Sequence, residues 1–333
     1  MDRNERRLLA LLKERRLSID ELAIAGHVTP KQAEHFVANL SERGARLEIR
    51  GKKEPSYHLN VLPQPGNTYT ISGASPDRVD FQVAAASDFH IASIFHLPKS
   101  LHECLRRTED AGIDVLLFAG DLMDGMGIYK GHEENLSHHG AERQTDEVAR
   151  VLNRYPKIQF LGIAGNHDYS ITQKAGIKPL AMVEAKTDNF KNLGDMRADV
   201  EIHGIRFRLL HGAGGRNYAR SYPSQTYLRD FFGGLERHQF ADVPHVMTIG
   251  HYHTLYSGKD HGIHILQAGS FQDGDNEYCV RRGLTGPTGL FHLKVSARKG
   301  QLEDFCAHYI EPKAARTEKG SAFAKTSKSY ARR

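Results

Sequence analysis

Gly120-Asp121-Leu122-Met123-Asp124-Gly125 is the stretch of sequence that decides the fold. It follows the apolar run 113–119, which predicts a buried strand of an α/β fold. A carboxylate directly after such a strand lies where open α/β sheets bind their ligands. Four other segments place polar side chains after apolar, β-branched or aromatic runs: Asp88-Phe89-His90, Gly165-Asn166-His167-Asp168, His211-Gly212 and Gly250-His251-Tyr252-His253. Together the five segments supply enough carboxylate, amide and imidazole groups to hold two metal ions.

Length and composition are those of an ordinary soluble protein. The 333 residues suffice for two or three domains, with 39% hydrophobic and 26% charged residues. No apolar run approaches the ~20 residues of a transmembrane helix, and the charged start of the chain precedes no apolar signal core. We therefore expect a cytoplasmic protein that does not enter a membrane. Cys104, Cys279 and Cys306 lie far apart, which argues against a disulfide framework or a thiolate zinc site.

The net charge of +5 is concentrated at the two ends of the chain. Residues 1–60 carry 12 Lys and Arg against 9 Asp and Glu, and residues 313–333 carry 7 against 1. Residues 61–312 carry 26 against 30, so the middle of the chain is acidic, as a cation-binding centre requires. The basic ends favour a polyanionic partner such as nucleic acid, although a solvated tail gives the same pattern.

The first 60 residues predict three helices followed by a basic hairpin. Capping boxes begin at Ser18 and Thr29, and segments 46–50 and 57–60 flank a turn. This order resembles a winged helix-turn-helix domain, which implies DNA contacts through the third helix and the hairpin. The residues that would make these contacts are Lys31, Gln32, His35, Asn39, Arg50, Lys52 and Lys53. Domains of this kind also serve as protein-docking or dimerisation modules.

The rest of the chain divides into a linker, a larger domain and a tail. Segment 61–80 contains three prolines and two glycines and predicts a linker. From 81 to 312, helical and strand patterns alternate before a strand-rich end, which indicates a layered α/β sandwich. We expect strands at 81–87, 113–119, 158–164, 245–249, 263–267, 289–295 and 305–310, and one or two strands at 200–210. We expect helices at 101–111, 141–154, 179–185 and 225–237. The basic tail 313–333 predicts disorder.

The five polar segments resemble, in their order along 81–272, the metal-binding blocks of the calcineurin-like metallophosphoesterases. This resemblance implies a four-layer α/β/β/α sandwich with a dinuclear metal centre. One ion would be held by Asp88, His90 and His253 and the other by Asn166, His211 and His251, with Asp121 bridging the two. Oxygen and imidazole ligands without thiolate favour two divalent ions, with Mn²⁺ preferred and Fe or Zn²⁺ as alternatives.

The same resemblance assigns roles to the residues beside the ligands. His167 would be the general acid for the leaving oxygen, or a phosphate-binding group. Asp168 would orient His167 and keep it cationic. Asp124 is outside the ligand pattern, and we expect it to hold its loop. We expect five further histidines to be ordinary structural residues: His96, His132, His138, His139 and His203.

A narrower resemblance covers 87–90 and the segment GDLMDGMGIYKGHEE at 120–134. These residues are similar to the phosphoesterase domain of the small subunit of archaeal D-family DNA polymerases, a proofreading 3′–5′ exonuclease. His132 stands where glutamine is expected, and the preceding domain looks like a winged helix rather than an oligonucleotide-binding barrel.

This resemblance implies a dinuclear-metal phosphodiesterase acting on DNA, as an exonuclease or an end-processing nuclease. Cleavage would proceed by in-line attack of a metal-bridging hydroxide, with His167 as acid. The alternative is a phosphomonoesterase or cyclic-nucleotide phosphodiesterase with a docking module at its N-terminus. The intact ligand set disfavours a DNA-binding regulator with an inactive enzyme domain. DNA is the expected partner, and a homodimer is possible.

Overall fold

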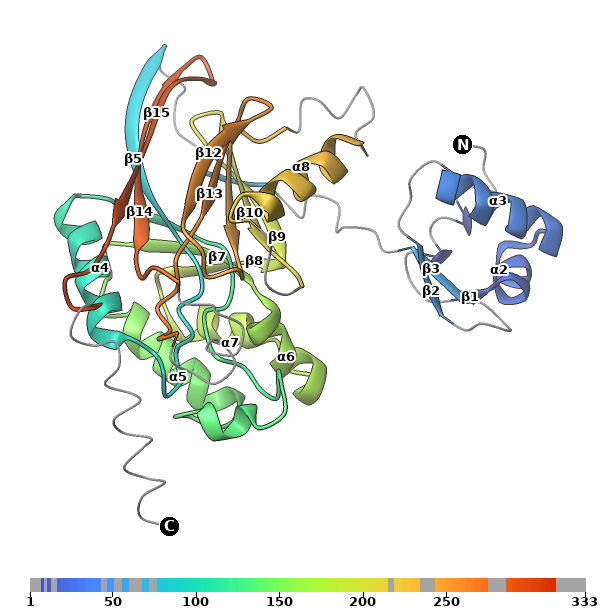
Figure 1. Cartoon of the computed structure of the whole chain (residues 1–333), viewed down its shortest axis with the longest axis horizontal. Helices are drawn as coiled ribbons and strands as arrows, with labels where there is room; N and C mark the ends of the chain where they lie inside the picture. Colours follow the sequence, from blue (N-terminus) through green and yellow to red (C-terminus); the bar gives the residue numbers. More distant parts are fainter. Residues whose placement is uncertain are drawn as a thin grey trace. The chain divides into compact units, whose positions relative to one another are not determined.

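The chain forms two compact units, which are drawn in Figure 1. The N-terminal unit comprises Met1–Gln64 and Tyr227–Ala241, and the large unit comprises Pro65–Thr226 and Asp242–Arg333. The computed structural model describes residues 7–8, 11–12, 17–42, 47–50, 56–59, 68–71, 77–214, 219–233, 243–274 and 286–315, and describes only the backbone at 38–42, 47–50 and 56–59. Lys52, Lys53 and the expected disordered tail beyond 315 lie outside the described residues.

The described part of the N-terminal unit is built from helices and a small sheet. Its elements are β1 (Leu17–Ser18), α2 (Ile19–Gly26), α3 (Pro30–Glu42), β2 (Leu47–Arg50) and β3 (Ser56–Leu59). The second and third predicted helices and the paired strands of the predicted hairpin are present. β3 also pairs antiparallel with β1, which the sequence pattern did not predict. Both predicted capping boxes form, since Glu21 N–H donates to Ser18 Oγ at 3.2 Å and Gln32 N–H donates to Thr29 Oγ1 at 3.3 Å.

Two six-stranded mixed sheets form the core of the large unit. The first sheet has the order β15 (Gln301–Ile310), β14 (Leu290–Arg298), β5 (Arg78–Ala86), β6 (Val115–Phe118), β7 (Gln159–Ala164) and β8 (Phe190–Asp195). The second has the order β12 (Tyr256–Asp260), β13 (Ile263–Gln267), β11 (Val246–Gly250), β10 (Ile205–His211), β9 (Arg197–Ile202) and β4 (Tyr69–Ile71). Parallel pairing joins β5 to β8 through β6 and β7, and joins β10, β11 and β13.

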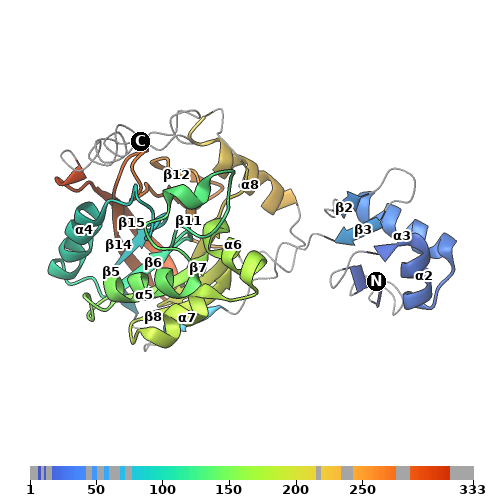
Figure 2. The same ribbon diagram turned by 90° about the horizontal axis from the view of Figure 1, so that it is seen from below.

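Helices cover the outer face of the first sheet, as Figure 2 shows for α4, α5 and α7. The described helices of this unit are α4 (Pro98–Asp110), a 3₁₀ turn (His132–Asn135), α5 (Ala141–Leu152), α6 (Asn166–Ala175) and α7 (Pro179–Lys186), while α8 (Tyr222–Gly233) begins in this unit. The start of α8 is joined to β13, because the Gln267 amide lies 3.3 Å from Ser224 Oγ.

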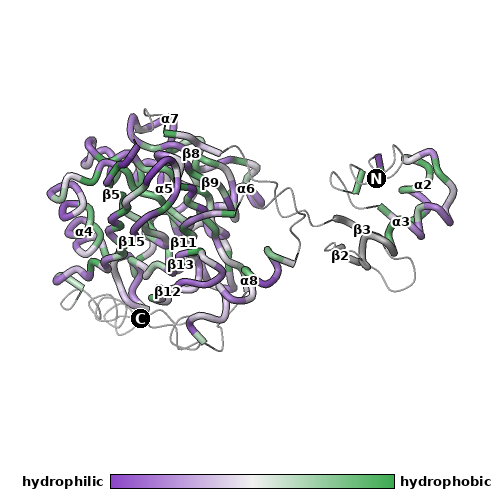
Figure 3. The backbone as a smooth tube through the Cα atoms, turned by 90° about the horizontal axis from the view of Figure 1, so that it is seen from above, coloured by the Kyte–Doolittle hydropathy of each residue, from purple (hydrophilic) through white to green (hydrophobic). Residues whose placement is uncertain are grey.

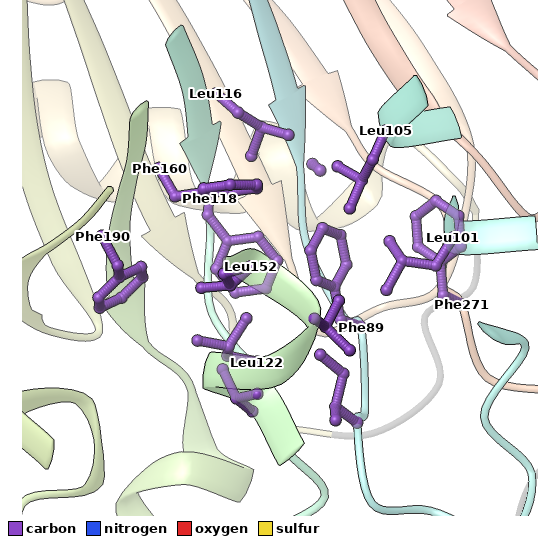
Figure 4. Packing of buried hydrophobic residues seen from close by; sticks show 14 of the residues in the cluster. Phe89, Leu101, Leu105, Leu116, Phe118, Leu122, Leu152, Phe160, Phe190 and Phe271 are labelled. Carbon is purple, nitrogen blue, oxygen red and sulfur yellow. The ribbon is translucent and has the colours of Figure 1, made fainter. Parts of the chain in front are cut away.

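Two apolar clusters hold the layers together. One lies between the helices and the first sheet and includes Phe89, Leu101, Phe118 and Leu152 (Figure 4). The other lies between the two sheets, where residues such as Leu161 and Phe207 are almost fully buried. Figure 3 shows hydrophobic residues along the inner strands and many hydrophilic ones along the outer helices, as amphipathic helices require. The predicted α/β fold with two packed sheets is therefore confirmed.

Several boundaries differ from the sequence prediction. The expected linker contains β4, which pairs parallel with β9 at the edge of the second sheet, and β5 begins three residues before the predicted strand at 81. β8, β12 and α6 were not predicted. β4 has only three residues, and in β12 half-buried and exposed residues alternate, with a glycine in the middle. Neither β4 nor β12 therefore has the apolar run that indicates a strand.

The described residues contain no helix that is long and apolar enough to cross a membrane.

Candidate metal centre

Polar side chains gather at the carboxyl ends of five strands. Asp88 and His90 follow β5, Asp121 follows β6, and Asn166 and His167 follow β7. In the second sheet, His211 is the last residue of β10, and His251 and His253 follow β11. Parallel pairing brings the carboxyl ends of neighbouring strands to one edge of each sheet, and the two edges meet. All seven residues predicted as metal ligands are thereby brought together.

The first group of ligands contains Asp88, His90 and His253. The Nε2 atoms of His90 and His253 lie 3.0 Å apart, and Nε2 of His253 lies 3.4 Å from Asp88 Oδ1. Asp88 and His90 are buried, and His253 is partly exposed. One atom from each residue lies within 4.8 Å of the others, so the group could hold one metal ion.

The second group contains Asn166, His211 and His251, with Asp121 beside them. Asn166 Oδ1 lies 3.0 Å from His211 Nε2 and 2.8 Å from His251 Nδ1. Asp121 Oδ2 lies 3.2 Å from His211 Nε2 and 3.9 Å from Nε2 of His90 in the first group. One carboxylate oxygen therefore faces both groups, which is the placement that a bridging ligand needs.

The outer nitrogens of three rings are held by acceptors outside the centre. His90 Nδ1 lies 2.9 Å from Asp124 Oδ1, His211 Nδ1 lies 2.8 Å from the Ala119 carbonyl, and His251 Nε2 lies 2.7 Å from the Gly214 carbonyl. These acceptors place the N–H on the outer nitrogen and leave the inner nitrogen as a lone-pair donor. At the second group, two such nitrogens and an amide oxygen converge, an arrangement that a cation satisfies and that suits the expected donor set.

In the metal-free chain, a proton on His211 partly takes the place of the cation. Burial opposes a charge on His211, but the nearby carboxylate of Asp121 outweighs it and raises the pKa of His211 to about 9. Asp121 itself is buried, yet His211 and His167 hold the pKa of its carboxyl well below the usual value. The site is therefore built around an ionised bridging carboxylate whose partner proton a metal ion must replace.

The ligand loops have an unusual backbone. Positive φ angles between 47° and 86° occur at five of the seven predicted ligands: Asp88, His90, Asp121, His251 and His253. Residues other than glycine seldom adopt this conformation, and such strain persists where surrounding structure enforces it, as at active sites. Phe89 supplies part of that enforcement, because its fully buried ring packs 4.6 Å from the ring of Phe118 and 5.3 Å from that of Phe271 (Figure 4).

Glycine is needed where the first sheet approaches the ligands. A Cβ atom at Gly165 would lie 2.2 Å from Asp121 Oδ1, and one at Gly120, where φ is +92°, would lie 2.4 Å from His211 Nδ1. Both positions exclude a side chain because the neighbouring backbone and ligands already fill the space.

His167 lies in the first turn of α6, beside the two ligand groups. Its backbone N–H donates to Asp121 Oδ1 at 2.8 Å, and its ring Nδ1 donates to the Asp124 carbonyl at 2.6 Å. The ring Nε2 is thereby left as the atom that can meet a substrate. Burial lowers the pKa of His167 to about 4, against the opposing attraction of Asp121, so the side chain is neutral at pH 7 and not cationic as expected.

The expected role of Asp168 as the residue that orients His167 is wrong. Its two carboxylate oxygens accept from the backbone N–H groups of Asp121, Leu122, Met123 and Gly165, at 2.8–3.2 Å. Asp168 therefore holds the loop that carries Asp121. The residue that holds the ring Nδ1 of His167 is Asp124, which the sequence pattern assigned only to its own loop.

Sequence reasoning missed two residues of the Asp124 environment. His132, expected to be an ordinary structural residue, is fully buried, with Nε2 3.3 Å from Asp124 Oδ2. Gln272 donates its amide N–H to Asp124 Oδ1 at 3.2 Å. Sequence spacing carried no signal for either contact, because both depend on how the loops after β6 and β13 fold.

The structure describes part of the expected nucleic-acid surface. Lys31, Gln32 and His35 are exposed on α3, although the side-chain oxygen of Gln32 accepts from Thr29 N–H at 2.9 Å within the helix cap. The side chains of Asn39 and Arg50, and the whole of Lys52 and Lys53, lie outside the described residues.

Comparison with known proteins agrees with this geometry. The family model of the calcineurin-like phosphoesterases matches residues 81–282. The DNA polymerase II small subunit of Methanothermobacter thermautotrophicus is 28% identical over 280 residues, covering 72% of this chain and 57% of that protein. That of Methanocaldococcus jannaschii is 26% identical over 302 residues, covering 78% of this chain and 49% of that protein. The chain thus spans about half the length of the curated relatives it matches.

Similar solved structures include an archaeal phosphodiesterase, with 12% identity and a TM-score of 0.39, which covers 69% of this chain and all of its own. Another is Vps29 of Cryptosporidium parvum, with 14% identity and a TM-score of 0.38, which covers 70% of this chain and 98% of its own. The matched range contains all five ligand loops and the converging acidic and imidazole groups described above. The chain therefore belongs to the calcineurin-like phosphoesterases and is a metal-dependent phosphoesterase.

Proposed function

We propose that this protein is a phosphodiesterase that hydrolyses DNA, as an exonuclease or in the processing of DNA ends. The observation that carries the proposal is the placement of Asp121 Oδ2 between two ligand groups, 3.2 Å from His211 Nε2 and 3.9 Å from His90 Nε2. Two divalent ions, with Mn²⁺ preferred, would lower the pKa of a shared water and offset the charge on the phosphoryl oxygens.

The residues of this chain would divide the remaining work. Seven side chains would bind the two ions: Asp88, His90, Asp121, Asn166, His211, His251 and His253. Nε2 of His167 would face the leaving oxygen, since its Nδ1 is held by the Asp124 carbonyl at 2.6 Å. The negative charge of a bound phosphate would raise the pKa of His167, so that it becomes a proton donor when substrate is present.

DNA as the substrate is supported by two further observations. The relatives described above are named as small subunits of a DNA polymerase. Lys31 and His35 are exposed on α3, in a unit that we propose to be a winged helix-turn-helix domain. Cationic and polar side chains on such a helix suit the phosphates and base edges of a duplex.

Cleavage of labelled DNA with Mn²⁺ tests the proposal. Wild-type protein should degrade the DNA, whereas a protein that hydrolyses only a small phosphomonoester or a cyclic nucleotide would contradict a DNA substrate. The double variant Lys31→Glu/His35→Glu should lose DNA cleavage and keep hydrolysis of bis(p-nitrophenyl) phosphate. The double variant Lys157→Glu/His261→Glu makes the same two changes at exposed positions of the large unit and is the matched control. Equal DNA cleavage by both variants would reject a DNA-binding role of α3.

A further inference from the structure

Asp124 is a buried carboxylate surrounded by three imidazole rings. Its side chain is fully buried, as is that of His132. The ring centroids of His90 and His167 lie 4.5 Å apart, and those of His132 and His167 lie 5.6 Å apart, both in edge-to-face arrangements. His90 is a proposed metal ligand and His167 the proposed acid, whereas the family pattern gives His132 no role. The ring of His132 therefore has no function assigned by the family pattern.

The hydrogen bonds of Asp124 occupy both of its carboxylate oxygens. Oδ1 accepts from His90 Nδ1 at 2.9 Å and from the Gln272 amide at 3.2 Å. Oδ2 accepts from His132 Nε2 at 3.3 Å. A buried carboxylate needs such donors because leaving it without them costs free energy. Of these three donors, only His132 bonds to Oδ2, so it fixes the rotation of the carboxylate plane.

His132 can be only a donor toward Asp124. Its Nδ1 accepts from the backbone N–H of Ile128 at 3.3 Å, which leaves the proton on Nε2. Its ring also packs 4.7 Å from that of Tyr129. Neutral His132 therefore has one defined tautomer and one defined orientation.

The loop that carries His132 is itself fixed to the helices. The Gln144 amide donates to the Gly125 carbonyl at 2.8 Å, and Met126 N–H donates to Ser170 Oγ at 2.8 Å. Lys174 Nζ donates to the Gly127 carbonyl at 2.7 Å. The position of His132 relative to Asp124 is thus determined by α5 and α6.

We propose that His132 is a positioning residue for phosphoester hydrolysis, acting by fixing the Asp124 carboxylate, whose Oδ1 lies 2.9 Å from His90 Nδ1 and 3.6 Å from His167 Nδ1. Asp124 Oδ1 takes the outer N–H of His90, and its carbonyl takes the Nδ1 N–H of His167 at 2.6 Å. Asp124 therefore determines the tautomer and orientation of both rings: that of the proposed ligand His90 and that of the proposed acid His167. The part that concerns His167 rests on the proposed function.

A third metal ion held by Asp124, His132 and His167 is the competing explanation, since one atom of each lies within 4.8 Å of the others. The hydrogen bonds argue against it. His132 Nε2 and His167 Nδ1 already carry protons that they donate to Asp124, while His132 Nδ1 accepts from Ile128. A third ion would require these bonds to be given up.

The test compares His132→Phe with His132→Gln. Phenylalanine keeps the ring volume and removes the N–H, whereas glutamine can donate to Asp124 and accept from Ile128 N–H. His139→Phe, at an exposed position of the same segment, is the matched control. Each protein is assayed on bis(p-nitrophenyl) phosphate, whose leaving group needs no proton, and on a DNA dinucleotide, whose sugar alkoxide needs one.

His132→Phe should lower kcat on the dinucleotide by about 10- to 100-fold, the usual effect of losing an outer-shell partner. It should change the nitrophenyl ester much less and leave the content of bound metal at two ions per chain. His132→Gln should restore most of the loss, and His139→Phe should resemble wild type. An equal loss on both esters for His132→Phe would overturn the part that concerns His167, and no loss on either ester would overturn the whole proposal. Loss of a third equivalent of metal would establish the competing explanation instead.

A measurement without activity separates this inference from the proposed function. In metal-free protein with ¹⁵N-labelled histidine, NMR should show His90 and His167 as single Nδ1–H tautomers, and mixed tautomers in His132→Phe. Unchanged tautomers in a folded His132→Phe protein would reject the positioning role. If His167→Ala lowers both esters equally, His167 is not the acid, and the tautomers of His90 and His167 still decide whether His132 positions Asp124.

Discussion

Replacing Asp121 by asparagine tests the bridging carboxylate with the smallest possible change of shape. The substitution removes one negative charge while keeping the side-chain volume. In the structure, Asp121 Oδ2 lies 3.2 Å from His211 Nε2 and 3.9 Å from His90 Nε2, and Oδ1 accepts from His167 N–H at 2.8 Å. An amide oxygen can keep one of these contacts but supplies no net charge to either ion.

The expected magnitude follows from Coulomb's law. A unit pair at 4 Å is worth about 4 kcal/mol at an effective dielectric constant of about 20, which is about a thousand-fold in affinity. Because the carboxylate faces both groups, each ion should be weakened by at least this factor. Activity at limiting metal should fall in parallel with metal content.

The assay is isothermal titration with Mn²⁺ alongside hydrolysis of bis(p-nitrophenyl) phosphate, with circular dichroism as the check on folding. Asn192→Asp, a reverse change of charge in β8 and outside the ligand loops, is the control and should bind two ions. A folded Asp121→Asn protein that binds both ions with unchanged affinity would refute the bridging role.

Three further outcomes are expected. Metal binding should release a proton from His211, whose pKa is raised to about 9. The affinity for metal should therefore fall about tenfold for each pH unit below 9. Calorimetric titration in buffers of different ionisation enthalpy measures this proton release, and its absence would contradict the prediction. Asp168→Ala removes the acceptor of four backbone N–H groups. It should lower the free energy of unfolding by at least about 1–3 kcal/mol, the cost of leaving one buried donor unsatisfied. Urea denaturation measures this against Asp188→Ala at the surface, and an equal effect of the two changes would count against the loop-holding role. Gly165→Ala would place a Cβ 2.2 Å from Asp121 Oδ1 and should displace that ligand, so that metal content drops. Gly233→Ala, where the added Cβ meets open space, is the control and should keep the metal. Full metal content in Gly165→Ala would contradict the close packing.

The convergence of the ligands was predictable from the sequence because it depends on simple geometry. Each ligand follows an apolar run, and parallel strands bring such positions to one edge. Asp121 after β6 and Asn166 after β7 are adjacent for this reason, and neither needed knowledge of side-chain packing.

The contacts that were not predicted depend on loop conformation. Nothing in the spacing of Asp168 indicated that it would accept from the amides of 121–123, since this requires the positive φ of Asp121 and the start of α6 at Asn166. The fold of the loop after β6, held by Gln144 and Ser170, likewise decides that His132 reaches Asp124. Short polar loops carry no periodic pattern from which such contacts could be read.

Crystals of the protein grown with Mn²⁺ test the dinuclear centre most directly, by anomalous diffraction at the manganese edge. Two peaks ~3.5–4 Å apart are predicted, one beside Asp88, His90 and His253, the other beside Asn166, His211 and His251, with Asp121 between them. A single peak, or two peaks that do not share Asp121, would contradict the account.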